Sequence, residues 1–260
     1  MLAGRGGDLI LVDRLTKSYP VRGGEVQALQ DVSFRVAPGE LVAVVGPSGC
    51  GKSTLLKLVA GLTEPTRGSV RLAGTPVTGP RRDVGIVFQQ PVLLPWRNVL
   101  DNVLLPVDVQ RLDQAIYLRR AYELIELVGL RGFEARYPSE LSGGMQQRVA
   151  ICRALLHNPA LLLMDEPFGA LDAMTREHMN LELLTIWQAS GQTVLFITHS
   201  IPEAVFLADR VVVMTPRPGR VAEVVDIALP RPREIELMNT EPFGALVKRI
   251  RTHFNMAAAL

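Results

Sequence analysis

At 260 residues, of which 48% are apolar, the chain is long enough for one large α/β domain with a subdomain. Its 28 basic and 26 acidic residues leave a net charge of +2, which is too small to indicate nucleic-acid binding. Two cysteines make no disulfide framework and favour a reducing compartment. No apolar run approaches the eighteen or so residues that span a bilayer, so any membrane role is expected to come through a partner.

The first third of the chain predicts a small antiparallel sheet. Leu9–Val12 and Ala28–Val36 alternate apolar and polar residues, and the Pro- and Gly-containing segment Tyr19–Gly24 predicts a loop between them. A further short strand lies between Gly68 and Gly74. Alternation is typical of strands with one face on a core and the other in solvent.

A glycine-rich segment between an apolar strand, Leu41–Val45, and a helical segment predicts a phosphate-binding loop. Glycines let the backbone approach an anion closely, and the N–H groups at the start of the following helix attract it. Lys52 reaches the β- and γ-phosphates in such loops, and the Ser53 hydroxyl binds Mg²⁺. The residues expected to bind the nucleotide here are Gly46, Pro47, Ser48, Gly49, Cys50, Gly51, Lys52, Ser53 and Thr54.

The middle of the chain predicts more helix than strand. Val84–Phe88 is a β-rich run that can join the core sheet. Residues 90–112 predict a Pro-punctuated loop, and Asp113–Val128 has apolar residues at helical spacing. Ser142 is then expected to cap a helix that continues to Asn158.

The last third alternates buried strands with helices. The expected strands are Ala160–Met164, Thr193–Thr198 and Val211–Met214, and the expected helices are Thr175–Ala189 and Pro202–Ala208. Continuous apolar strands with helices between them predict a parallel sheet that is covered on both faces. The Pro-rich, basic segment 216–232 is expected to follow the surface, and residues 241–254 predict a final amphipathic helix.

Two acids follow the apolar strand that begins at Ala160. A carboxylate at the carboxyl end of a parallel strand lies at the ligand crevice of such a sheet. Asp165 is therefore expected to hold Mg²⁺ through water, and Glu166 to orient and deprotonate an attacking water.

A second anion site is predicted at Ser142–Gly144, where another helix starts. One domain binds one triphosphate, so the second site is suited to a nucleotide that another copy of the chain holds. A dimer follows from this interpretation.

The order of these motifs closely resembles the nucleotide-binding subunit of ATP-binding cassette (ABC) transporters over roughly residues 8–225. Residues 141–147, Leu-Ser-Gly-Gly-Met-Gln-Gln, match the signature motif of that family. The resemblance implies an α/β P-loop NTPase fold with a mainly parallel core sheet, an antiparallel β subdomain and a helical subdomain. It implies an ATPase domain over 8–230, with the helical subdomain inserted at about 91–157, and a C-terminal extension over 231–260.

The resemblance also implies roles for single residues. Tyr19 corresponds to the aromatic residue that stacks on adenine, Gln89 to the Q-loop glutamine, Asp172 in Ala170-Leu171-Asp172 to the D-loop, and His199 to the switch histidine at the γ-phosphate. The catalytic set is then Lys52, Glu166 and His199, and the Mg²⁺ set is Ser53, Gln89 and Asp165. The residues expected to contact the partner copy's ATP are Leu141, Ser142, Gly143, Gly144 and Gln146.

Residues 90–103 resemble the importer subgroup for nitrate, taurine and aliphatic sulfonates. That resemblance implies ATP and Mg²⁺, a second copy, two transmembrane permease subunits and, indirectly, a solute-binding protein, with the chain at the cytoplasmic face of the membrane. The expected contacts with the permease are Gln89, Leu93, Leu94 and Trp96. For the three apolar residues, packing within the helical subdomain is the alternative.

Three other functions remain open at this point. One is a soluble ABC-type ATPase that acts on nucleic acid or ribosomes, although a single cassette with little net charge does not favour it. The second is a metabolite kinase, in which Ser142–Gly144 would be an ordinary turn. The third is an exporter ATPase.

Overall fold

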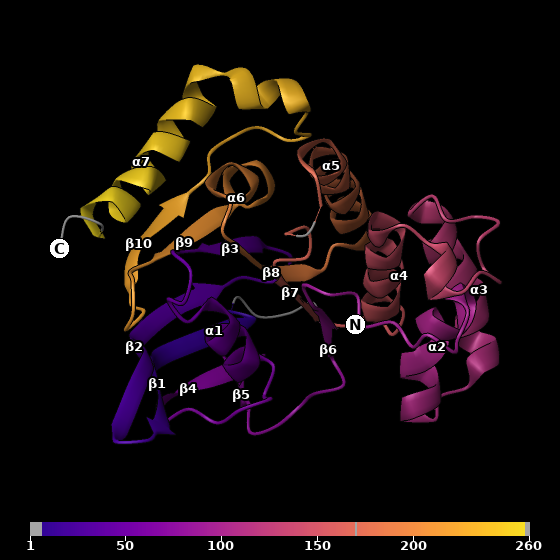
Figure 1. The fold of residues 1–260 in the computed structure, drawn as a ribbon, viewed down its shortest axis with the longest axis horizontal. Helices are drawn as coiled ribbons and strands as arrows, with labels where there is room; N and C mark the ends of the chain where they lie inside the picture. The colour runs from indigo at the N-terminus through magenta and orange to yellow at the C-terminus, as the bar shows by residue number, and fades with distance from the viewer. Residues whose placement is uncertain (1–6, 170, 258–260) are drawn as a thin grey trace. The chain divides into compact units, whose positions relative to one another are not determined.

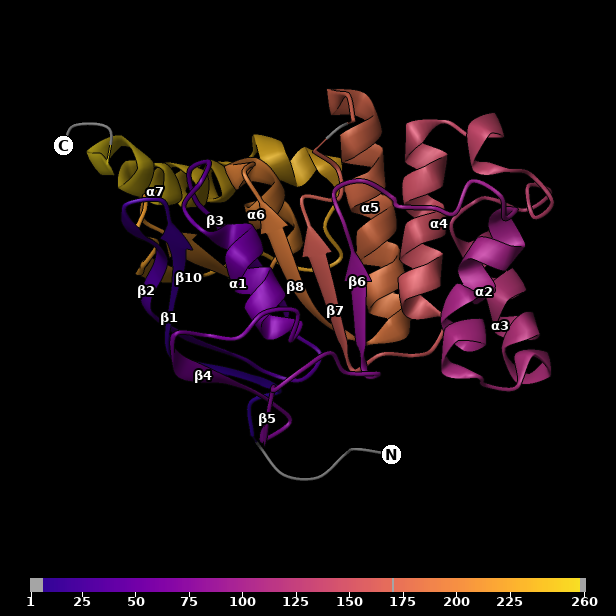
Figure 2. The ribbon, with the colours of Figure 1, turned by 60° about the horizontal axis from the view of Figure 1, so that its bottom comes forward.

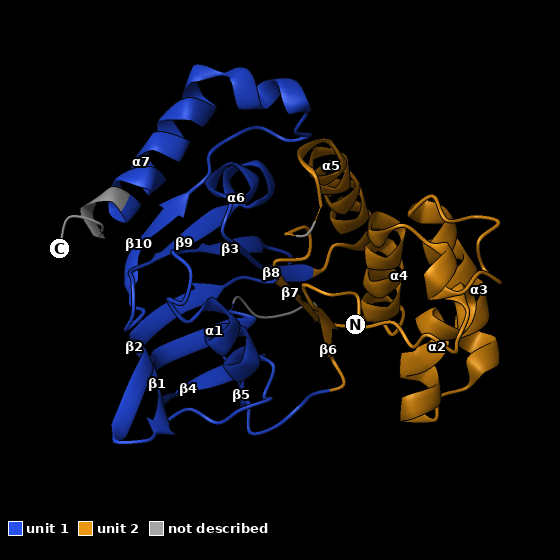
Figure 3. Cartoon of the chain, in the orientation of Figure 1, with its two compact units in different colours: residues 1–81, 193–260 blue, residues 82–192 orange. Residues whose placement is uncertain are grey.

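The computed structural model describes residues 7–169 and 171–257. The chain divides into two compact units, which Figure 3 colours separately. Unit 1 consists of residues 1–81 and 193–260, and unit 2 of residues 82–192. Within the described residues, no helix combines the length and apolar character that a membrane crossing requires.

Unit 1 contains the predicted antiparallel sheet, with strand order β2-β1-β4-β5. Its strands are β1 (Ile10–Val21), β2 (Gly24–Val36), β4 (Arg67–Leu72) and β5 (Thr75–Pro76). The prediction of a loop at Tyr19–Gly24 is wrong. Val21 pairs with Gly24, and a tight turn in which Gly23 has φ 90° joins two strands that are longer than expected. Cross-strand pairing extends the hairpin beyond its apolar stretch, which alternation alone does not reveal.

Unit 1 also contains buried strands in the order β10-β9-β3-β8. β3 (Leu41–Val45) runs parallel to β8 (Thr193–Thr198) and to β9 (Arg210–Met214), as expected for continuous apolar strands. Helices α1 (Lys52–Val59) and α6 (Ile201–Leu207) lie on opposite sides of these strands (Figure 2).

The Pro-rich segment 216–232 is not simply a surface wrap, because it contains β10 (Val221–Asp226), which pairs antiparallel with β9. Beyond it come the short 3₁₀ helix η2 (Ile235–Asn239) and α7 (Glu241–Ala257), which confirms the expected final helix. Phe243 and Ile250 of α7 are buried, and the helix lies beside α6 (Figure 1).

Unit 2 pairs β6 (Val84–Val87) in parallel with β7 (Leu161–Asp165). Its helices are α2 (Val99–Gln110), α3 (Gln114–Leu127), the 3₁₀ helix η1 (Pro138–Glu140), α4 (Gly143–Leu155) and α5 (Ala173–Ser190).

Helix α2 was not expected, because a proline inside an apolar run predicts a loop. The structure keeps Pro106 within the helix, while Val99, Val103 and Val107 form a buried stripe at helical spacing. Burial of this stripe outweighs the hydrogen bond that the proline cannot make. The Asn98 side chain also caps the helix by accepting from Asp101 N at 2.8 Å.

Candidate functional site

The phosphate-binding loop joins β3 to α1, as the sequence predicts, and its last glycine is required by space. Gly51 has φ 104°, and a Cβ there would lie 2.6 Å from Leu29 Cδ2 and 2.8 Å from Ala28 O. Gly51 is also the N-cap residue, so no side chain caps the first N–H groups of α1. These donors and the helix dipole make the start of α1 suited to an anion.

Lys52 folds over the same loop. Its side chain is 6% exposed, and Nζ donates to Gly46 O at 2.9 Å and to Pro47 O at 3.3 Å. A buried ammonium that donates to carbonyls of the loop itself is well placed to bind phosphate oxygens, because charged partners make stronger hydrogen bonds than neutral ones.

A segment that sequence reasoning did not connect with this loop supports it from outside. Arg217 Nε donates to Gly49 O at 3.2 Å, and Gly219 N donates to Ala28 O at 3.0 Å. A Cβ at Gly219 would lie 2.0 Å from Cys50 O, so the segment passes very close to the loop. In the sequence, Gly219 after Pro218 was the one sign of this contact. A glycine permits a close approach of two backbones, but the sequence does not show which segment approaches it.

Unit 1 also contains the predicted adenine-stacking and switch residues. Tyr19 is half-buried on β1, with Lys17 Nζ 5.0 Å from the centre of its ring. His199 is exposed between β8 and α6. Unit 1 therefore provides Tyr19, residues 46–54 and His199.

Unit 2 provides the two acids and Gln89, the predicted Q-loop glutamine. Asp165 ends β7, and Glu166 follows it with φ 45°, a left-handed conformation that costs a residue with a side chain about 1 kcal/mol or more. A Cβ at Gly169 would lie 3.3 Å from Glu166 O and 3.4 Å from Gln89 Nε2. Gln89 and Glu166 therefore flank the same glycine.

The predicted signature turn is exposed at the start of α4. Ser142 is the N-cap, and its Oγ accepts from Met145 N at 3.3 Å. A Cβ at Gly143 would meet no atom within 4 Å. Gln146 Nε2 donates to Pro138 O at 2.9 Å and to Leu141 O at 3.3 Å, so this amide holds the turn in shape.

Asp172 caps α5, and Ala170 of the predicted D-loop lies outside the described residues. Asp172 Oδ2 accepts a hydrogen bond from Thr175 Oγ1 at 2.6 Å, and Asp172 Oδ1 accepts one from Thr175 N at 3.0 Å. These bonds, the hydroxyl first, lower the pKa of the Asp172 carboxyl. Asp172 is therefore the N-cap residue of α5, a role that is separate from the predicted D-loop role.

Residues 91–97, called the platform here, form a partly exposed loop whose backbone is hydrogen-bonded by side chains of α2 and α4. Asn102, which is fully buried, donates to the carbonyl oxygens of Leu94, Arg97 and Asn98 and accepts from Leu94 N. Arg153 donates to Pro91 O at 2.7 Å and to Val92 O at 2.8 Å.

The exposed apolar side chains of this platform differ in part from those expected. Trp96 is 71% exposed and Val92, which sequence reasoning missed, is 58% exposed. Leu93 and Leu94 are half-buried.

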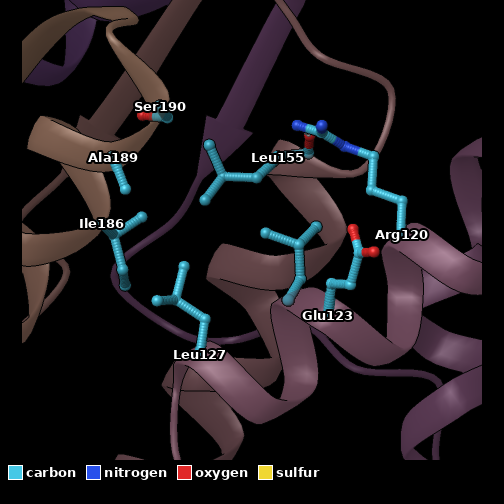
Figure 4. A pocket seen from close by; sticks show the side chains of 8 residues that line it. Arg120, Glu123, Leu127, Leu155, Ile186, Ala189 and Ser190 are labelled. Atoms are coloured by element: carbon cyan, nitrogen blue, oxygen red, sulfur yellow. Dashed lines mark hydrogen bonds between the residues drawn. The ribbon is translucent and has the colours of Figure 1, made fainter.

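A separate cavity of about 190 Å³ in unit 2 lies between α3 and the ends of α4 and α5 (Figure 4). Leu127, Leu155 and Ile186 line it, with Arg120 and Glu123 on one side. It contains none of the predicted site residues, so it is not the nucleotide site.

Comparison with known proteins matches residues 29–169 to the ABC transporter family model. The chain is 52% identical over 223 residues to an uncharacterized ABC transporter ATP-binding protein, MJ0412, of Methanocaldococcus jannaschii, covering 86% of this chain and 84% of that one. It is 42% identical to the aliphatic sulfonates import ATP-binding protein SsuB of Bacillus cereus, covering 94% and 95%. It is 50% identical to the taurine import ATP-binding protein TauB of Escherichia coli, covering 81% and 82%.

Solved structures agree with the sequence comparison. A dimeric ATP-binding cassette, MJ0796, in a post-hydrolysis state with ADP and Pi bound, superposes with a TM-score of 0.74 at 33% identity. The match covers 85% of this chain and all of that chain. The expected fold class, an α/β P-loop ATPase with a parallel core and an antiparallel sheet, is confirmed. The chain belongs to the ABC transporter family and is one of its ATPase subunits.

Proposed function

We propose that the chain energises the import of a small solute of the sulfonate or taurine type by binding and hydrolysing Mg-ATP in a head-to-tail dimer. The names of its relatives support the solute class, since two of them are import ATP-binding proteins for aliphatic sulfonates and taurine. These names do not favour an exporter, a metabolite kinase or an ATPase that acts on nucleic acid.

One observation carries the proposal: the start of α1 lacks a side-chain cap and has Lys52 folded over it. The triphosphate binds there, at residues 46–54, and its oxygens take over the Lys52 ammonium from the carbonyls of the loop. Adenine stacks on Tyr19. The exposed turn Ser142–Gly144 of a second copy, with Leu141 and Gln146 supporting it, covers this ATP.

The donor set suits Mg²⁺, because a hard cation prefers oxygen ligands and Ser53, Gln89 and Asp165 offer a hydroxyl, an amide and a carboxylate oxygen. When bound, Mg²⁺ neutralises charge on the phosphates. Glu166 takes the proton of the attacking water, and Lys52 and His199 stabilise charge on the γ-phosphate. Asp172 lies at the dimer seam in this proposal.

The platform at 91–97 is the proposed contact with the membrane. In each copy of the dimer, the exposed Trp96 and Val92 and the half-buried Leu93 and Leu94 bind a short helix of one of the two transmembrane permease subunits at the cytoplasmic face. Gln89 stands at the entrance to this loop and beside Gly169, so a change at Glu166 is transmitted through it. A solute-binding protein then acts on the permease and not on this chain.

The decisive variant is Glu166→Gln, which keeps the shape of the side chain and removes the base. We expect it to bind ATP, to lose hydrolysis by about 100-fold or more, and to accumulate as an ATP-bound dimer in size-exclusion chromatography with light scattering. Glu236→Gln, an exposed position in unit 1, is the control with the same charge change. A Glu166→Gln protein that remains monomeric with ATP contradicts the composite site.

The solute class is tested in cells. Deleting the gene is expected to abolish growth on taurine or an alkanesulfonate as sole sulfur source and to leave growth on sulfate unchanged. A gene that encodes Trp96→Ala, reintroduced into the deletion strain, is expected not to restore this growth. The purified Trp96→Ala subunit is expected to keep its ATPase activity. Normal growth of the deletion strain on both sulfonates contradicts the solute class and leaves the ATPase proposal standing.

A further inference from the structure

Two arginines that belong to no nucleotide motif fill the C-terminal end of α6. Arg233 is 4% exposed, and its Nη1 donates to Phe206 O and Ala208 O, both at 2.8 Å, and to Val205 O at 3.3 Å. Arg231 Nη2 donates to Leu207 O at 2.8 Å. Four successive carbonyls that a helix end leaves without intrahelical partners are thus satisfied by two guanidinium groups.

These arginines lie on a strap, defined here as residues 227–234, which follows β10 and crosses the end of α6. The strap is bound beyond the helix as well. Arg231 also donates to Asp209 Oδ1 at 2.8 Å, and Asp209 Oδ2 accepts from Leu41 N at 2.9 Å, at the first residue of the strand that leads to the phosphate loop. The strap therefore ties the end of α6 to the base of β3.

The other end of α6 holds the backbone on both sides of His199. Ser200 N donates to Thr198 Oγ1 at 3.0 Å, and the Thr198 hydroxyl donates to the buried carboxylate of Glu203 in the first turn of α6. His199 itself is exposed between these two anchored residues. Its backbone position thus depends on where α6 sits.

Helix α6 is only seven residues long and almost wholly buried, so it has little length over which to absorb a displacement. Loss of the guanidinium groups leaves buried carbonyls unsatisfied, and the helix must shift or fray to hydrate them. Either response moves Ser200 and Glu203, and with them the backbone of His199.

We infer that Arg233, assisted by Arg231, is a positioning residue for His199: the strap fixes α6, and α6 aims the imidazole. The consequence for ATP hydrolysis rests on the proposed function, in which His199 contacts the γ-phosphate. Displacing a catalytic group from a distance lowers the rate of the chemical step and leaves substrate binding largely intact.

The test compares Arg233→Lys with Arg249→Lys, a control on α7 where the arginine pairs with Glu223 outside the strap. Lysine keeps the charge, but its side chain is one bond shorter, so its ammonium falls short of the point from which Arg233 Nη1 reaches all three carbonyls. For Arg233→Lys we expect kcat to fall about tenfold or more while KM for ATP changes less than about twofold. The control is expected to match the wild type.

A double-mutant cycle separates positioning from general destabilisation. If Arg233 acts through His199, adding Arg233→Lys to His199→Ala lowers kcat no further. Equal losses in both backgrounds, or a kcat for Arg233→Lys like that of the control, overturn the inference.

A readout that does not depend on hydrolysis separates this inference from the proposed function. The imidazole resonances of His199, identified by their absence in His199→Ala, are expected to shift in Arg233→Lys and not in Arg249→Lys. If they shift while His199→Ala hydrolyses ATP normally, the positioning stands and the catalytic role of His199 fails. Unshifted resonances contradict the positioning itself.

Discussion

The two helix starts that the sequence marks as anion sites are built in opposite ways. At α1 the N-cap is Gly51, no side chain caps the helix, and the buried Lys52 lies over the loop. At α4 the N-cap is Ser142, whose own hydroxyl accepts from Met145 N, and the turn is exposed. The start of α1 has no side-chain cap, whereas the start of α4 is capped by its own exposed serine.

This difference suggests different roles for the two glycine-containing helix starts. A glycine N-cap gives up the stabilisation of a serine or aspartate cap, a loss that a bound anion at the helix start restores. The capped turn at α4 needs no ligand for its stability. It is suited to close over a phosphate that another molecule supplies. The four predictions below test this contrast.

The largest effect is expected from Gly51→Ala. The new Cβ would lie within 3 Å of Leu29 Cδ2 and Ala28 O in a backbone of φ 104°, so we expect a loss of about 3 kcal/mol in the free energy of unfolding. Urea denaturation measures this loss. Gly74→Ala is the matched control, since Gly74 has φ 76° and open space, and strain alone costs about 1 kcal/mol. Equal losses in the two variants refute the close packing of the loop.

Lys52→Ala is expected to weaken ATP binding by about 10- to 100-fold, since it removes charged hydrogen bonds to the phosphates. Equilibrium titration with a fluorescent ATP analogue measures the affinity. Lys57→Ala, a change of the same kind on the exposed side of α1, serves as control and should bind normally. Unchanged affinity in Lys52→Ala would remove the α1 site from the proposal.

Ser142→Ala is expected to cost about 0.5–1 kcal/mol of stability through loss of the cap. Asp113→Ala removes the cap of α3 in the same unit and provides the comparison. Both variants should unfold slightly earlier in urea, but only Ser142→Ala should also weaken the ATP-bound dimer in the Glu166→Gln background. If both variants dimerise equally well, the serine is a cap and nothing more.

Gly143→Ala should have the smallest effect on folding. An added Cβ meets no atom within 4 Å, so the free energy of unfolding should change by less than about 0.5 kcal/mol. In the proposed dimer the methyl group would occupy the surface that covers the partner's ATP. We therefore expect a stable monomer that dimerises poorly with ATP by light scattering. Normal dimerisation would place the contact elsewhere on the chain.

Much of the site was predictable because its chemistry depends on the order of neighbouring residues. The loop from Gly46 to Ser53, the acids Asp165 and Glu166 and the cap at Ser142 are local patterns, and each lies on the element that the sequence predicted. The limits of the domains and the individual site roles remain predictions.

Apart from the hairpin turn at Gly23, the missed features depend on partners far away in the chain. Helix α2 forms through Pro106 because its valine stripe is buried by other helices, and β10 forms because β9 offers an edge. Neither neighbour can be found from local spacing. The same holds for Arg233, whose three acceptors lie more than twenty residues away.

The sequence by itself determined the phosphate loop, the acids that follow β7 and the family to which the chain is similar. These follow from spacing along one strand–loop–helix unit, where geometry is set by the covalent chain. Only the tertiary structure decided which helix start is left uncapped, which apolar side chains of the 91–97 platform are exposed, and how the strap holds α6. Such features depend on burial and on which carbonyls are left for distant donors, and no local pattern specifies either.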